Sequence, residues 1–164
     1  MWYCSWQTSL VHEVSDRRFK VSNESGASPL LTVRWRLTPE VVEEMLAHAR
    51  ACYPREACGV LAGYADGLQK HYPGHNVAPG NEHFLLDPVA QRLIFADIAW
   101  HGWKLLAIYH SHPRRDASPS LNDLRLAAYP QALTIIISLA DWDHPEIRSY
   151  QVHNGQAREV QLKQ

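Results

Sequence analysis

The stretch KLLAIYHSHPRRDASPSLND, residues 104–123, decides how this chain is expected to fold. It begins with a mostly apolar run, as a buried strand does, and it turns polar where that strand should end. His110 and His112 stand two residues apart at this end. Residues two apart in an extended segment project to the same side, so both imidazoles can reach one point while Ser111 faces elsewhere.

Asp123 completes a set of three possible metal ligands. Ten residues separate it from His112, and two prolines stiffen the loop between them. Two neutral imidazoles and a carboxylate suit zinc, and three protein ligands leave a fourth position for water. Asp123 also has a structural interpretation, because Ser120 followed three residues later by an acid resembles a capping box. The two histidines at a strand end favour the ligand, and the pattern predicts one zinc ion per chain.

Glu56 is the predicted proton-transfer group. It directly precedes ACGVLAG (57–63), a predicted buried strand, where a carboxylate is costly unless it has a role. Zinc lowers the pKa of a bound water and polarises an amide carbonyl, and a carboxylate can move the proton to the leaving amine. These residues together predict a zinc hydrolase. His71 and His75 form another possible pair, but the intervening YPG indicates a loop and no partner acid is evident.

The remaining periodicity predicts helices alternating with strands. LLTVRWR (30–36) predicts a strand, and Thr38-Pro39-Glu40 has the order of a helix start. This helix should end at Pro54. Its expected buried stripe consists of Val41, Val42, Met45, Leu46 and Ala49. Asp87-Pro88 opens a second helix. Its expected buried positions are Val89, Leu93, Ile94 and Ile98.

Three further elements complete the expected domain. A third helix should run from about Ser120 to Tyr129, and Leu133–Leu139 is β-branched enough for a buried strand. Residues 147–152 and 157–162 predict a hairpin around Asn154-Gly155. Buried and amphipathic strands interleaved with helices predict an α/β domain with a mixed sheet covered by helices.

Length and composition limit the possible classes of protein. The 164 residues fit one domain, which we place at residues 30–164, with residues 1–29 as an N-terminal extension of weak periodicity. A formal charge of −1 gives no sign of a nucleic-acid or membrane partner. No apolar run approaches the roughly 20 residues of a membrane span, and a secretion signal is absent. The odd cysteine count without CxxC spacing predicts reduced thiols in a cytoplasmic protein, with Cys58 as a small buried hydrophobe.

With Glu56, HSHP (110–113), Ser120 and Asp123 in place, the chain resembles the JAMM (MPN-plus) zinc metallopeptidases. The pattern of that family is a Glu upstream of HxHP, then a Ser and an Asp three residues beyond it. The resemblance runs from about Leu31 to Leu162 and is greatest to small bacterial stand-alone members associated with ubiquitin-like sulfur-carrier proteins. It implies a cytidine-deaminase-like α/β fold with a curved mixed sheet packed by helices.

The resemblance also implies roles for single residues. His110, His112 and Asp123 become zinc ligands, Glu56 the general acid/base, and Ser120 a donor to the oxyanion. Members of this family cleave peptide or isopeptide bonds after the C-terminal Gly-Gly of ubiquitin-like proteins. In some bacterial members the leaving group is a C-terminal amino acid such as cysteine. The expected substrate is therefore a ubiquitin-like sulfur carrier or its conjugate.

The sequence allows alternatives for the role of two arginines and for the function. Arg114 and Arg115 follow the ligand motif and are candidates to contact a substrate carboxylate or tail, with solvated loop arginines as the alternative. The competing function is a non-catalytic MPN-type binding scaffold, against which the intact ligand set argues. A zinc nucleobase deaminase on a similar fold lacks the required PCxxC pair. The oligomeric state is not encoded in any visible pattern.

Overall fold

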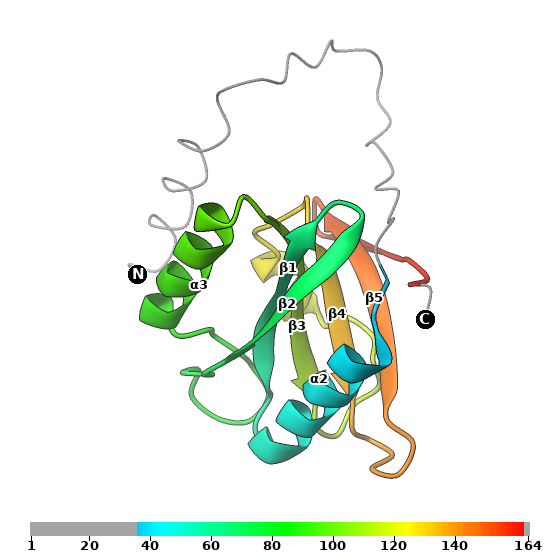
Figure 1. Ribbon diagram of the computed structural model, residues 1–164. Coiled ribbons are helices and arrows are strands. Elements are labelled where there is room, and N and C mark those ends of the chain that lie inside the picture. The colour runs from blue at the N-terminus through cyan, green and yellow to red at the C-terminus, as the bar shows by residue number, and fades with distance from the viewer. Residues whose placement is uncertain (1–35, 163–164) are drawn as a thin grey trace. The chain divides into compact units, whose positions relative to one another are not determined.

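Strand β3 (Lys104–His112) lies inside a six-stranded sheet of order β2-β1-β3-β4-β5-β6 (Figure 1). The computed structural model describes residues 36–162, apart from the side chain of Gln69. β3 pairs antiparallel with β1 (Cys58–Tyr64) and parallel with β4 (Leu133–Ser138). β3 is buried over most of its length, as its apolar sequence predicted. The predicted mixed sheet is confirmed.

The two edges of the sheet differ in how well the sequence predicted them. β5 (Glu146–His153) and β6 (Gln156–Glu159) form the predicted hairpin, with positive φ at Asn154 and Gly155 as a type I′ turn requires. β2 (Gly67–Gly74) forms the opposite edge, so the prediction of a loop across YPG is wrong. Pro73 is tolerated there because an edge strand leaves one side of its backbone unpaired.

Helix α2 (Pro39–Cys52) covers one face of the sheet (Figure 1). Thr38 caps it, accepting a hydrogen bond from the Val41 backbone N–H. The predicted stripe is confirmed: Met45 and Ala49 are fully buried, and the other three residues of the stripe pack against the same cluster. That cluster also holds the side of β3 that carries Tyr109. The imidazoles of His110 and His112 therefore belong to the opposite face.

Helix α3 (Pro88–Trp100) packs on that opposite face, against residues of β1. Ile98 is buried and Ile94 partly so, as predicted. The prediction for Val89 and Leu93 is wrong, because these side chains are 57% and 67% exposed. Phe95 turns inward with the two isoleucines and rotates the contact surface of the helix away from the other pair. Apolar residues thus lie on two sides of this helix, and only the side with Phe95 and the two isoleucines packs against the sheet.

Helix α4 (Leu121–Leu126) is shorter than the predicted helix, which was expected to reach Tyr129. At Ala127 the backbone becomes extended. Tyr129 instead packs edge-on against Phe95 of α3 and accepts a hydrogen bond from Gln91. The helix therefore ends before Tyr129, and the contacts of Tyr129 hold the segment after α4 against α3.

Some of the predictions fall outside the described residues. They concern the extension at 1–29, Cys4 and the strand predicted at 30–36, of which only Arg36 is described, outside any strand. The domain boundary at residue 30 stays a prediction. Cys52 and Cys58 are free thiols, and Cys58 is fully buried as predicted. Between residues 36 and 162, no helix is both long and apolar enough to span a membrane.

Candidate metal centre

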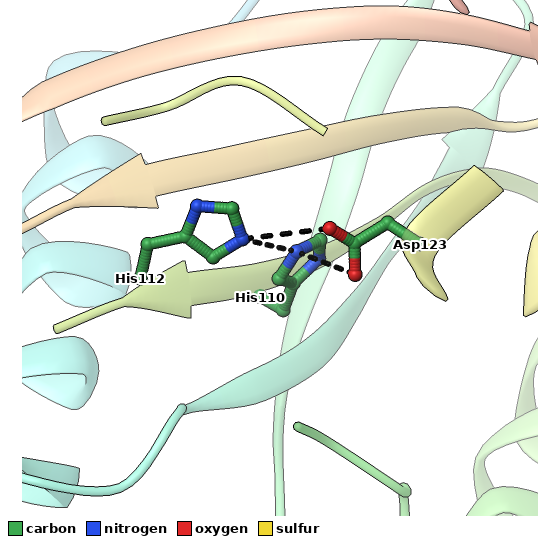
Figure 2. A group of neighbouring side chains, drawn as sticks. All are labelled: His110, His112 and Asp123. Carbon is green, nitrogen blue, oxygen red and sulfur yellow. Dashed lines mark hydrogen bonds and ion pairs between the residues drawn. The ribbon is translucent and has the colours of Figure 1, made fainter. Parts of the chain in front are cut away.

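His110, His112 and Asp123 converge on one point, as Figure 2 shows. The two imidazoles extend from the end of β3, and the carboxylate comes from the first turn of α4. The Nε2 atoms of the histidines lie 3.1 Å apart. Asp123 places Oδ1 3.4 Å from the Nε2 of His110 and Oδ2 3.5 Å from that of His112. The predicted ligand set is thus brought together.

These three groups fit a tetrahedral zinc ion. Bond lengths of about 2.0–2.1 Å separate two ligands of such an ion by roughly 3.3 Å, close to the spacings between these donors. His112 donates its Nδ1–H to the Asp116 carbonyl oxygen at 2.7 Å. The Nε2 of His112 therefore keeps a lone pair, which faces His110 and Asp123 and can bind a metal ion. A histidine oriented in this way is prepared to bind a cation.

His110 is held by stacking and burial. Its ring lies 4.6 Å from the ring of Phe84, at an interplanar angle of 20°. Burial lowers the pKa of His110 although Asp123 opposes the effect, and the imidazole stays in the neutral form that binds metal. Its Nδ1 has no hydrogen-bond partner among the described residues. Stacking against Phe84 therefore helps to orient the His110 imidazole.

Asp123 satisfies both interpretations of its position. It accepts a hydrogen bond from the Ser120 backbone N–H at 2.6 Å and donates its own N–H to the Ser120 hydroxyl at 3.2 Å, completing a capping box. Its carboxylate faces both histidines at the same time. Burial opposes its ionisation, but the contacts with the imidazoles of His110 and His112 outweigh burial and hold the pKa of Asp123 well below its usual range.

Glu56 lies just before β1 and is 2% exposed. Cys58 stands opposite His110 in the β1–β3 register. Ser111 connects the two segments: its hydroxyl accepts the Ala57 N–H at 2.8 Å, and its own N–H bonds the Ala57 carbonyl at 3.0 Å. Burial raises the pKa of Glu56 to about 7, against the opposing effect of His112. A carboxyl group with this pKa can both accept and donate a proton near neutral pH.

Asn76 is a residue of this region that the sequence did not reveal. Its buried amide donates to the carbonyl oxygens of Glu56 at 2.8 Å and His83 at 3.0 Å. Its side-chain oxygen accepts from the backbone N–H groups of Ala78 at 2.9 Å and Leu85 at 3.0 Å. All four hydrogen-bonding positions of the amide are used. An asparagine in a loop has no sequence signal that separates such a network from an ordinary turn.

Ser120 and the two arginines occupy different positions around the centre. The Ser120 hydroxyl oxygen accepts a bond from Asp123, which leaves its proton free to be donated. Arg115 brings Nη2 to 3.6 Å from Oε1 of Glu56, with its side chain 45% exposed. Arg114 is exposed, and no ion pair of this residue is found within residues 36–162. The structure therefore separates two arginines that the sequence could only treat together.

Comparison with known proteins gives a consistent set of similarities. Residues 38–153 match a family model described as prokaryotic homologs of the JAB domain. The CysO-cysteine peptidase of Mycobacterium tuberculosis is 35% identical over 122 residues, which cover 73% of this chain and 84% of that protein. The desampylase of Haloferax volcanii is 32% identical over 132 residues, covering 73% and 95% of the two chains.

A solved structure shows the same fold. The solution structure of a protein from Desulfitobacterium hafniense matches with a TM-score of 0.69 at 39% identity, covering 77% of this chain and 89% of that one. The family model spans the helices and strands from α2 to the end of β5. All the residues that converge on the candidate centre lie within this span.

Proposed function

Because this chain belongs to the family of prokaryotic JAB-domain homologs, we propose that it is a zinc-dependent peptidase acting on a ubiquitin-like sulfur-carrier protein. The bond cleaved follows the C-terminal Gly-Gly of the carrier. The single observation that carries the proposal is the convergence of His110, His112 and Asp123 beside the buried Glu56. A binding scaffold needs no such set of groups.

The chain's own residues perform the proton transfers. His110, His112 and Asp123 would hold the zinc ion, which would supply Lewis acidity toward a water and the scissile carbonyl. Glu56 accepts a proton from the attacking water and returns it to the leaving nitrogen, a step generally worth about 10²–10⁴-fold in rate. Ser120 donates its free hydroxyl proton toward the developing negative oxygen, and losing one such donor typically costs about 10²–10³-fold. The hydroxyl oxygen of Ser111 accepts the Ala57 N–H, which supports a structural role and not a nucleophile.

Other parts of the proposal follow from the same residues. The free thiols of Cys52 and Cys58 support a reducing compartment, and we propose the cytoplasm. We also propose one zinc ion per chain, because each chain contributes a complete ligand set.

Purified protein incubated with a carrier that ends in Gly-Gly plus one further residue tests this function. We expect intact-mass spectrometry to show loss of the added residue, abolished by a chelator and restored by zinc. Glu56→Gln should keep its zinc by metal analysis and lose at least about 10²-fold in rate. Glu43→Gln, an exposed substitution of the same kind on α2, should behave as wild type.

Two results would contradict the proposal. Wild-type turnover by Glu56→Gln removes that residue from the chemistry. A folded wild-type protein that binds no zinc, and that is unaffected by loss of both histidines, identifies the scaffold instead.

A further inference from the structure

Arg115 combines an anchored backbone with a partly exposed positive charge. Its carbonyl oxygen accepts a bond from the Ser138 hydroxyl at 2.6 Å. The next residue, Asp116, is held through its carbonyl by His112, and a tyrosine hydroxyl of β5 bonds the carbonyl of Ala117 at 2.8 Å. Ala117 is fully buried, whereas the Arg115 side chain is 45% exposed. The loop therefore places a cation at a defined position and leaves its side chain partly open to solvent.

The contact with Glu56 uses little of this cation's bonding capacity. One nitrogen of Arg115 lies 3.6 Å from one oxygen of Glu56. A guanidinium has five N–H donors in a planar fork, and this contact engages at most a small part of them. The remaining donors are available to a second anion, and the fork is suited to a carboxylate that binds through both oxygens.

The position next to Glu56 determines which part of a substrate Arg115 can meet. In the proposed function Glu56 returns a proton to the leaving nitrogen, so that nitrogen must come within hydrogen-bond reach of Glu56. If the leaving group is one amino acid, its carboxylate carbon is two covalent bonds from the nitrogen. If the leaving group is a lysine side chain, four methylenes follow the nitrogen and no negative charge lies near. A cation beside Glu56 thus distinguishes these two leaving groups.

We propose that Arg115 binds the free carboxylate of a single amino acid leaving group, so that the enzyme favours carriers extended by one residue over lysine-linked conjugates. The inference rests on the proposed peptidase function. Arg115 then acts as a specificity-determining residue, and its contact with Glu56 is the arrangement of the substrate-free protein.

Two peptides with the same carrier tail test the inference. Both end in Gly-Gly plus one amino acid, and one carries a free carboxylate where the other carries a carboxamide. We expect wild type to cleave the free acid with a kcat/KM about 10–100-fold higher, since charge-assisted bonds are this strong. Arg115→Gln should lose this preference by slowing only the free acid, and Arg115→Lys should keep part of it. Arg114→Gln, the matched control, should keep all of it.

The outcomes separate the possible roles of Arg115. Equal cleavage of both peptides by wild type overturns the inference. Equal slowing of both by Arg115→Gln also overturns it, because that result means the arginine only balances the charge of Glu56. If neither peptide is cleaved, the experiment with the whole carrier protein tests the peptidase function separately. The same peptides are then titrated into chelator-treated protein, where equal affinity of wild type for acid and amide rejects Arg115 as a carboxylate site.

Discussion

At the scale of single residues, Glu56 links the chemistry of the site to the stability of the fold. Its burial raises its pKa from the ordinary 4.5 to about 7, so the folded chain binds this proton more tightly than the unfolded chain does. Unfolding therefore releases a proton between these pH values. The contribution of Glu56 to the free energy of unfolding is highest below about pH 4.5 and decreases as the pH rises toward 7.

Glu56→Gln should remove this pH dependence. We compare the free energy of unfolding of metal-free Glu56→Gln with that of metal-free wild type. The variant's value minus the wild-type value should increase by about 1–3 kcal/mol between pH 4.5 and 8. Urea denaturation of the two proteins in chelator measures the difference, because titrations common to both cancel. A difference that stays constant with pH contradicts an elevated pKa at Glu56.

The site residues differ in how far the sequence could predict them. His110 and His112 follow from strand periodicity, which places residues two apart on one side. Asp123 was ambiguous, because helix capping and metal binding use the same residue type; two carboxylate oxygens allow it to do both. Phe84 and Asn76 were not identified, since their roles depend on a loop conformation that no local pattern encodes.

At the scale of elements, the segment that follows β2 supports both halves of the centre. Asn76 bonds the carbonyl of Glu56 and holds the loop that carries Phe84 against His110. An isolated bridge pairs Asn76 with Leu86 and closes this loop. The proposed general base and one proposed zinc ligand are thus positioned by one short stretch of chain.

Asn76→Ala should weaken the fold and the site together. It removes the partner of two carbonyl oxygens and two N–H groups, and leaving buried groups unpaired costs about 1–3 kcal/mol each before relaxation and water offset part of it. We expect a net loss of about 2–4 kcal/mol in urea denaturation, with kcat falling more than KM changes. Asn122→Ala, whose amide makes one long contact of 3.4 Å, is the control. Wild-type kcat in Asn76→Ala would contradict a positioning role.

Helices, strands and turns could be predicted where the local sequence pattern is compatible with only one structure. The apolar stripe of α2 and the turn at Asn154-Gly155 each favour a single structure, and both were predicted. β2 was missed because Pro73 is a strand breaker except at an edge, and edges are decided by the order of the whole sheet. The end of α4 depends on the distant contact of Tyr129 with α3.

At the scale of the whole molecule, metal binding should stabilise the folded chain. A ligand that binds only the folded state adds about 2.7 kcal/mol at a concentration of 100 Kd. For a chain of this length each kcal/mol raises Tm by roughly 2–4 °C, so we expect zinc to raise Tm by about 5–10 °C in calorimetry. An unchanged Tm in saturating zinc would argue against a preformed site.

Asp123→Asn makes this test specific. Asparagine retains an oxygen that can accept the Ser120 N–H but loses the charge that faces the two histidines, so the metal-free Tm should fall. Measured from that lower baseline, most of the zinc shift should disappear. His101→Ala, at a half-exposed histidine after α3, should keep the full shift. Full zinc stabilisation of Asp123→Asn would assign the carboxylate to the capping box alone.

The three proposed ligands differ in how firmly the fold holds them. Both imidazoles belong to an interior strand, which opens only when the sheet as a whole comes apart, whereas the carboxylate belongs to a six-residue helix with no buried residue of its own. Fraying of that helix detaches one ligand and leaves two in place. Exchange of a bound ion with solution should therefore follow the local opening of α4, at a rate far above that of global unfolding.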